Sequence, residues 1–291
     1  MDAVARIERT LETALAPALS FAGPPRLGAA IRHAVFPGGA RVRPRLCLAV
    51  AMACGHGDEP FAHAAAAALE LIHCASLVHD DLPCFDAATL RRGLPSVHHA
   101  FGESLAVLAG DALIVLAFET LAQAATPDSA TSLAPLMLLL SRSTGLPRGI
   151  IAGQAWECEP EIPLTTYHRA KTASLFSAAT MAGALAAGGE AGCWQALGER
   201  LGEAYQVADD IRDVVATASE LGKPSGRDQA LGRPSIALQQ GVPGAMLRLK
   251  SLVGEAIAAI PPCPMAAELR GLIRLEVQRL LPQEALLHAA A

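Results

Sequence analysis

The chain has 291 residues, of which 52% are hydrophobic and 4% aromatic, and its formal net charge at pH 7 is −5. A negative net charge gives no electrostatic support for binding nucleic acid, so we expect no nucleic-acid partner. The seven cysteines form no CxxC pair, which argues against a zinc site or a disulfide framework and favours a reducing compartment.

The sequence also bears on membrane association. The first twelve residues contain three acidic side chains and show no signal-peptide pattern. The longest apolar stretch, residues 61–78, contains His63, Glu70 and His73, which suits a buried core helix better than a membrane span. We therefore expect a soluble cytoplasmic protein without a transmembrane segment.

In chain order, helical periodicity first covers residues 3–19, and Pro24-Pro25 is expected to stop that helix. A second helix is expected at residues 27–35, followed by a turn at Pro37-Gly38-Gly39. Three arginines then occur within five residues, at Arg41, Arg43 and Arg45. Beside a glycine-rich turn such a run can bind an anion, although it also fits a basic surface turn.

The stretch from Glu70 to Gly93 combines an apolar run with acidic and basic groups. It presents three aspartates and then two arginines: Asp80, Asp81, Asp86, Arg91 and Arg92. Carboxylates are costly beside apolar surface unless they are neutralised, and oxygen ligands favour a hard cation such as Mg²⁺. Arginine pairs suit phosphate oxygens. The stretch therefore indicates a metal and a phosphate ester, the alternative being a solvated acidic helix end followed by a basic turn.

Asp80 and Asp86 are six residues apart, a spacing that places them on different faces of a regular helix. Pro83 lies between them and can break the regular turn. We therefore expect a local distortion that brings Asp86 back towards Asp80.

Two apolar helices are expected at residues 105–125 and 130–143. Farther on, the segment Tyr167–Phe176 places Lys171 and Thr172 at a helix turn. A lysine is a mobile point charge that suits phosphate, but a surface lysine on a helix is the more ordinary interpretation.

A second acidic cluster, AYQVADDIRDV, covers residues 204–214. Asp209 and Asp213 are four residues apart and share a helix face, and Gln206 lies one turn earlier. Two acidic clusters on separate apolar helices would hold more than one metal ion if they faced each other.

These motifs resemble the trans-isoprenyl diphosphate synthase (polyprenyl synthetase) family. DDLPCFD resembles the family's first aspartate-rich motif in its longer bacterial and plant form, and DDIRD resembles the second. The resemblance extends from GGARVRP near Gly38 to LGRPS near Ser235, and several motifs occur in the family's order.

The resemblance implies a role for each matching residue. Catalytic roles are implied for Asp80, Asp81, Asp86, Lys171, Asp209 and Asp210. The cofactor is expected to be Mg²⁺, held by Asp80, Asp86 and Asp209. Substrate contacts are implied for Arg43, His73, Arg91, Arg92, Lys171, Thr172, Gln206, Lys223 and Arg233. Among these, Arg43, His73 and Arg92 would hold isopentenyl diphosphate, and Arg91, Lys171 and Lys223 the allylic diphosphate.

The sequence departs from the family pattern at three positions. Ala40 replaces the lysine of GGKRxRP, and Arg41 or Arg45 would have to compensate if isopentenyl affinity is kept. Glu157 replaces the aspartate of GQxxD, which moves that carboxylate by about one bond length. Arg233 replaces the second lysine of a basic loop.

No strand-type alternation recurs along the chain, and the later part is expected to form helices broken at Pro243 and Pro261-Pro262. We expect an all-α fold: a single domain over residues 1–291 with about ten or more helices around a central active-site cavity. The resemblance also implies a homodimer.

The implied reaction is a head-to-tail condensation of isopentenyl diphosphate with dimethylallyl, geranyl or farnesyl diphosphate. Ala75 and Ser76 are small and lie about one turn before Asp80. Small residues there, with the longer DDxxxxD spacing, resemble geranylgeranyl diphosphate synthases and favour a twenty-carbon product for carotenoid or chlorophyll-type prenyl chains.

Three alternatives stay open. A farnesyl diphosphate synthase would stop one condensation earlier. A terpene cyclase shares the metal-diphosphate chemistry but needs no second diphosphate site. A non-catalytic subunit of a prenyl synthase is favoured by the lysine missing at Ala40, although both aspartate motifs are present.

Overall fold

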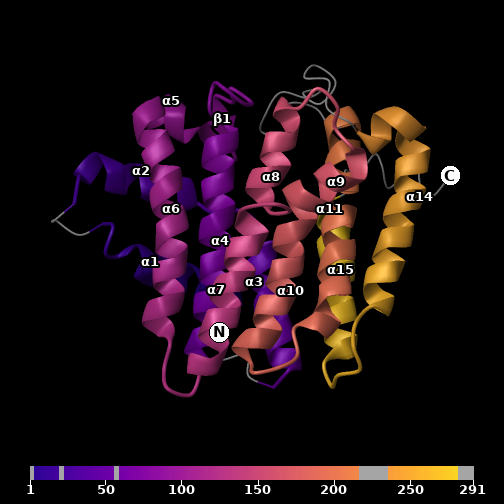
Figure 1. The fold of residues 1–291 in the computed structure, drawn as a ribbon. Helices are drawn as coiled ribbons and strands as arrows, with labels where there is room; N and C mark the ends of the chain where they lie inside the picture. Colours follow the sequence, from indigo (N-terminus) through magenta and orange to yellow (C-terminus); the bar gives the residue numbers. More distant parts are fainter. Residues whose placement is uncertain (1–2, 20–22, 56–58, 216–234, 281–291) are drawn as a thin grey trace. The chain divides into compact units, whose positions relative to one another are not determined.

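The computed structural model describes residues 3–19, 23–55, 59–215 and 235–280 (Figure 1). The chain forms two compact units: Met1–Leu140 with Ala182–Gly189, and Ser141–Met181 with Glu190–Ala291. We call these unit 1 and unit 2 and describe each by itself. The single-domain organisation and the central cavity stay predictions.

Unit 1 consists of helices and one short hairpin. Its elements are α1 (Ala3–Leu15), α2 (Pro25–Val35), α3 (Val42–Ala53), α4 (Pro60–Asp80), β1 (Leu90–Arg91), β2 (Leu94–Pro95), α5 (Val97–Phe101), α6 (Glu103–Ala124) and most of α7 (Ala130–Thr144). The first helix ends at Leu15 and not at the predicted residue 19, and Pro25 opens α2, which was predicted to begin at residue 27. Proline suits this first helical position because its missing N–H would have no partner there.

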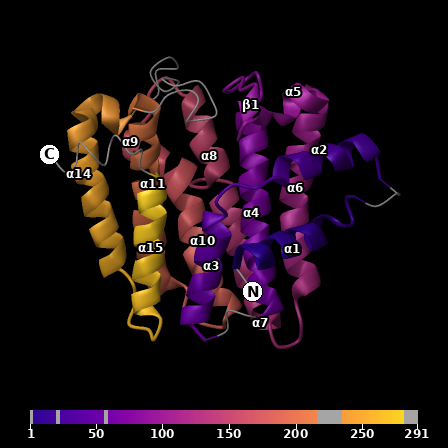
Figure 2. The same cartoon turned by 180° about the vertical axis from the view of Figure 1, so that it is seen from behind.

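The core of unit 1 is built around α4, which packs against α1, α2, α3 and α6 (Figure 2). Its alanine-rich run from Ala62 to Ala68 is almost all buried, as are Leu69, Leu71 and Ile72. A helix that is apolar on every side must be buried. Because α4 is fixed on all these sides, its last residue, Asp80, starts the acidic segment from a rigid support.

Unit 2 is also helical. Its elements are α8 (Ile150–Ala155), η1 (Trp156–Cys158), α9 (Leu164–His168), η2 (Arg169–Ala173), most of α10 (Ser174–Ala186), η3 (Gly192–Trp194), α11 (Gln195–Val215), α14 (Ile236–Ala258) and α15 (Ala266–Leu280). The core lies between α11 and α14, with Val207, Ile211, Leu249 and Leu252 buried.

The all-α prediction is confirmed. More than ten α-helices occur in the described residues, and the described strands are limited to the two-residue pair β1 and β2. The predicted break near Pro243 is also confirmed, because Gly241 has φ 71° inside α14 and the helix bends there. The break at Pro261-Pro262 falls between α14 and α15, as predicted.

Two of the described helices, α4 and α6, are long and apolar enough to cross a membrane. The apolar window of α4 is 78% buried, which suits the predicted core helix, whereas that of α6 is 39% buried. On α6 the side chains of Val107, Leu108 and Val115 are exposed.

Glycines set the distance between α11 and the segments beside it. A Cβ on Gly202 would lie 2.3 Å from the Cα of Ala173 in η2, and one on Gly198 would lie 2.4 Å from the Cα of Ser177 in α10. These contacts are with backbone, which cannot rotate away. Because these two glycines have no side chain, α11 packs directly against the backbone of η2 and α10.

We predict that Gly202→Ala lowers the free energy of unfolding by about 1–3 kcal/mol, as overpacking does. Gly254→Ala on α14 is the matched control, because nothing lies within 4 Å of its added Cβ. The control should be neutral or stabilise the protein by up to ~1 kcal/mol. Urea unfolding of both variants tests the packing, and equal shifts would contradict it.

Candidate functional site

The acidic segment after α4 folds back on the end of that helix. The backbone N–H of Asp86 donates to the carbonyl of Asp80 at 3.0 Å, and that of Ala88 donates to the carbonyl of Asp81 at 3.1 Å. Ala87 adopts a left-handed conformation, φ 47°, to make this return. The predicted distortion around Pro83 is confirmed, and it brings Asp86 back to Asp80.

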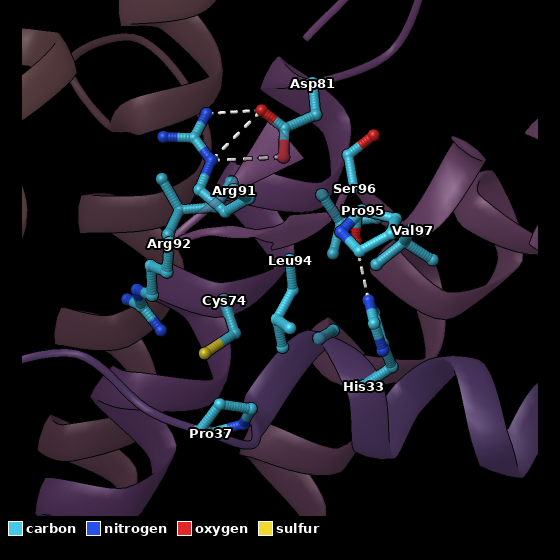
Figure 3. A pocket seen from close by; sticks show the side chains of 13 residues that line it. His33, Pro37, Cys74, Asp81, Arg91, Arg92, Leu94, Pro95, Ser96 and Val97 are labelled. Carbon is cyan, nitrogen blue, oxygen red and sulfur yellow. Dashed lines mark hydrogen bonds and ion pairs between the residues drawn. The ribbon is translucent and has the colours of Figure 1, made fainter. Parts of the chain in front are cut away.

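Within this segment, Asp81 is held by Arg91 of β1 (Figure 3). Arg91 Nε donates to both carboxylate oxygens at 3.1 Å, and Nη2 also bonds to Oδ1. Burial opposes a charged Arg91, but the hydrogen bond and charge of Asp81 outweigh it and raise the pKa of Arg91. Arg91 Nη2 lies 3.8 Å from Asp80 Oδ2, so the same guanidinium also faces the first aspartate.

The hairpin sends its two arginines in different directions (Figure 3). Arg92 and Gly93 both have positive φ, 53° and 78°, as a two-residue hairpin turn requires. Arg92 lies against the glycine turn before α3: a Cβ on Gly39 would lie 3.0 Å from its guanidinium. Gly39 thus leaves room for the guanidinium of Arg92, 53 residues farther along the chain.

His73 on α4 lies among these cations. Its pKa is well below the ordinary value, first because of burial and then because of the charges of Arg43 and Arg92. The imidazole is therefore neutral at physiological pH and can hydrogen-bond without adding charge. The structure brings together the three residues that the sequence analysis assigned to isopentenyl diphosphate.

Arg41 has a different task from the one considered in the sequence analysis. It is 2% exposed, donates to Glu8 at 2.7 Å and to Glu70 at 2.6 Å, and also bonds the carbonyl of Val35. A Cβ on Gly38 would lie 2.2 Å from its guanidinium. The hypothesis that Arg41 replaces the lysine missing at Ala40 is wrong, because its guanidinium is used inside unit 1.

In unit 2, Lys171 and Thr172 lie on η2, a single π-helical segment, a feature often found at functional sites. Lys171 Nζ bonds to Glu157, which also accepts from Tyr167 Oη at 2.7 Å and from Gln154 Nε2 at 3.3 Å. Glu157, which replaces the family aspartate, therefore reaches Lys171.

The three aspartates of the second motif differ in burial. Asp209 is exposed, Asp213 is 8% exposed and Asp210 is completely buried. Asp210 accepts from Gln206 Nε2 at 2.9 Å and from the backbone N–H of Ile236 at 2.7 Å. Asp210 is therefore anchored inside unit 2, and its catalytic role stays a prediction.

Two predicted substrate residues, Lys223 and Arg233, lie outside the described residues. The roles of Glu8, Glu70 and Tyr167 were not predicted from the sequence. A signal existed for Glu70, because a carboxylate in the middle of an apolar helix needs a partner. Nothing in the sequence pointed to Tyr167.

The comparisons with known proteins decide the family. The sequence profile of the polyprenyl synthetase family matches residues 24–257. The chain belongs to this family. It is 52% identical to a geranylgeranyl diphosphate synthase of Cereibacter sphaeroides over 279 residues, which cover 96% of each chain. It is 49% identical to that of Rhodobacter capsulatus over 95% of each chain.

The solved structures agree with the family. One similar structure is a Helicobacter pylori geranyltransferase complexed with magnesium and isoprenyl diphosphate, with TM-score 0.82, 32% identity and coverage of 95% of this chain and 96% of that one. Another is a geranylgeranyl pyrophosphate synthetase of Pyrococcus horikoshii, with TM-score 0.79, 26% identity and coverage of 96% and 95%. The resemblance and the isoprenoid synthase fold are thereby confirmed.

We predict that Arg41→Met destabilises the protein by about 3–5 kcal/mol, because it leaves the buried Glu70 without its cation. The matched control is Arg32→Met, whose pair with Glu12 is 48% and 45% exposed and should contribute little. Chemical denaturation measures both variants.

A second comparison separates charge from packing. Arg41→Met combined with Glu70→Gln should be less destabilised than Arg41→Met alone, because less unpaired charge stays buried. If the double variant has a lower free energy of unfolding than Arg41→Met alone, the ion pairs of Arg41 are not the source of the stability.

Proposed function

We propose that the chain is a Mg²⁺-dependent prenyltransferase that condenses isopentenyl diphosphate with allylic diphosphates and releases geranylgeranyl diphosphate. The observation that carries the proposal is that Arg92 lies against Gly39, in the turn before Arg43, within the same unit as the first aspartate motif. The charges of both arginines also act on His73. Cations in addition to Arg91, which the carboxylates already engage, suit a second diphosphate, which a terpene cyclase does not need. The names of the relatives at 52% and 49% identity support the product.

The carboxylates fit Mg²⁺ that arrives with a substrate. In the described part of the chain, no three His, Cys, Asp or Glu side chains lie close enough to hold a metal by themselves. Mg²⁺ usually takes one or two carboxylates and completes its shell with water and substrate phosphate. Asp80, Asp86 and Asp209 would hold it, and when bound it would supply Lewis-acid stabilisation of the departing diphosphate.

The other charged residues would bind and orient the substrates. Lys171 offers an ammonium to the allylic diphosphate, and Lys223 is proposed for the same task. Positive groups at this position stabilise the negative charge that develops as the C–O bond breaks. Arg43, His73 and Arg92 would hold isopentenyl diphosphate so that its double bond attacks the allylic carbon. The proton lost afterwards can pass to the released diphosphate, so no side-chain nucleophile is required.

Product length is the finer part of the proposal. Ala75 is 1% exposed and already packed inside unit 1, whereas Ser76 is half-buried and bonds the carbonyl of His73 at 2.8 Å. Of the two candidates, Ser76 is the position that can accept a larger side chain without displacing the core. We propose that its small size leaves room for a chain longer than fifteen carbons.

We also propose a cytoplasmic homodimer that supplies carotenoid or chlorophyll-type prenyl chains. The exposed apolar side chains of Val107, Leu108 and Val115 on α6 support an interface, because a face of this kind favours burial against another chain.

The direct test uses purified protein, Mg²⁺ and isopentenyl diphosphate with dimethylallyl, geranyl or farnesyl diphosphate in turn. Geranylgeranyl diphosphate from each primer is expected. A hydrocarbon formed from the allylic substrate alone would support a cyclase, and no product from any mixture would support a non-catalytic subunit. A product that stops at fifteen carbons would support a farnesyl synthase.

We predict that Asp80→Ala and Asp209→Ala each lower turnover by at least ~10²-fold, the range for removing one strong transition-state stabiliser. The assay is run with Mg²⁺ limiting. Near-normal turnover in either variant would remove that carboxylate from the metal site.

We predict that Ala40→Lys lowers the KM for isopentenyl diphosphate and leaves that for the allylic substrate little changed. It restores a cation beside Arg43, and Arg41 is not available to replace it. Steady-state kinetics with each substrate varied in turn measure the effect. An unchanged isopentenyl KM would mean that the remaining arginines already suffice.

We predict that Ser76→Phe shifts the product towards farnesyl diphosphate while overall activity is retained. Ala75→Phe should instead lower stability, because it must enter a packed core. Chromatography of the dephosphorylated products and thermal unfolding distinguish the two. If Ser76→Phe still gives a twenty-carbon product, the residue does not limit chain length.

A further inference from the structure

A chain of hydrogen bonds connects three elements of unit 2. Thr172 Oγ1 on η2 donates to Gln206 Oε1 at 2.6 Å, and Gln206 Nε2 on α11 donates to Asp210 Oδ1 at 2.9 Å. The backbone N–H of Ile236, at the start of α14, donates to Asp210 Oδ2 at 2.7 Å. All three bonds have ordinary lengths.

The donors and acceptors of this hydrogen-bond chain can be arranged in one direction. The N–H of Ile236 can only donate, and Asp210 accepts with both oxygens while completely buried. The amide group of Gln206 must therefore turn its NH₂ to Asp210 and its oxygen to Thr172. Because a hydroxyl has a single proton, Thr172 gives that proton to Gln206 and keeps only lone pairs for other partners.

Backbone packing keeps this direction in place. Thr172 is next to Ala173, whose Cα would lie 2.3 Å from a Cβ on Gly202, one turn before Gln206. On another side, a Cβ on Gly153 would lie 2.3 Å from the backbone nitrogen of Lys171. The segment that carries Thr172 therefore cannot slide along α11 to find another partner.

We propose that Asp210 is a positioning residue that fixes the polarity of Thr172 through Gln206. Thr172 then presents its oxygen as an acceptor, to a proton donor or to positive charge, and does not donate to a diphosphate oxygen. The proposal rests on the proposed function, because it takes Thr172 to lie beside the allylic substrate as the neighbour of Lys171 on η2. It differs from the sequence-based assignments, in which Asp210 was catalytic and Thr172 bound diphosphate.

Asp210→Asn tests the direction with almost no change of shape. The N–H of Ile236 requires the new amide oxygen, so the new NH₂ faces Gln206. The amide of Gln206 must then turn over and donate from its own NH₂ to Thr172. The hydroxyl of Thr172 then accepts that bond and can donate its proton to another group. We expect kcat to fall at least ~10-fold, as for a hydrogen bond made with the wrong polarity. The KM for isopentenyl diphosphate and the Mg²⁺ concentration at half-maximal rate should not change.

The rescue variant combines Gln206→Glu with Asp210→Asn. The glutamate accepts from both the new amide and Thr172, so the original direction returns and the net charge stays the same. Most of the lost kcat should return. Gln206→Glu alone is the control, and it should be impaired because two carboxylates then face each other.

A double-mutant cycle with Thr172→Val shows whether Asp210 acts through Thr172. In the Thr172→Val background, Asp210→Asn should have little further effect on kcat. The same cycle is measured by urea unfolding. The changes in the free energy of unfolding should also be non-additive, because both substitutions disrupt the same chain of hydrogen bonds. The unfolding cycle does not depend on the reaction, so it tests the hydrogen-bond chain even if the wild type forms no prenyl product.

Several results would overturn the proposal. An increased Mg²⁺ requirement in Asp210→Asn would make Asp210 a metal ligand. Normal kcat in that variant, no rescue by the combined variant, or effects that multiply in the cycle would each remove the coupling to Thr172. Failure of the proposed function is a different outcome, namely a wild-type protein without condensation activity.

Discussion

The ion pair between Asp81 and Arg91 is the interaction on which the candidate site of unit 1 depends. The carboxylate is 2% exposed at the end of an apolar helix, where an unpaired charge would cost several kcal/mol. Its partner is ten residues away on β1, so pairing closes the intervening segment into a compact loop. Asp80, Asp86 and Arg92 all lie on this loop or at its ends. The pair therefore shapes the part of the molecule that carries the proposed metal ligands.

The same constraint acts elsewhere with different partners. Arg41 is buried and neutralised by Glu8 and Glu70, and this fixes the turn before α3 that precedes Arg43. In unit 2, Asp210 is completely buried and accepts from two N–H donors, the side chain of Gln206 and the backbone of Ile236. In each case a buried charged group is bonded within its own unit. These bonds fix the backbone that carries a neighbouring functional residue. Adjacent aspartates in one motif therefore have different tasks.

Sequence reasoning predicted what depends on local pattern. The apolar run that ends at Asp80 indicated α4, and Pro83 between Asp80 and Asp86 indicated the distorted turn. It could not predict pairing over long separations, such as Arg41 with Glu8, because nothing local distinguishes a buried arginine from a basic surface turn. It also could not rank Asp209 and Asp210, since their burial depends on which face of α11 meets α14. The π-helical segment at Lys171 had no sequence signal either.

The most direct test of this account is a double-mutant cycle with Asp81→Asn and Arg91→Gln, followed by kcat. If the two side chains act as one structural pair, each single change lowers kcat at least ~10-fold, and the double variant is no more than about twofold below the weaker single variant. If the two factors multiply, Arg91 acts on the substrate independently of Asp81, and the ion pair does not shape the site as described.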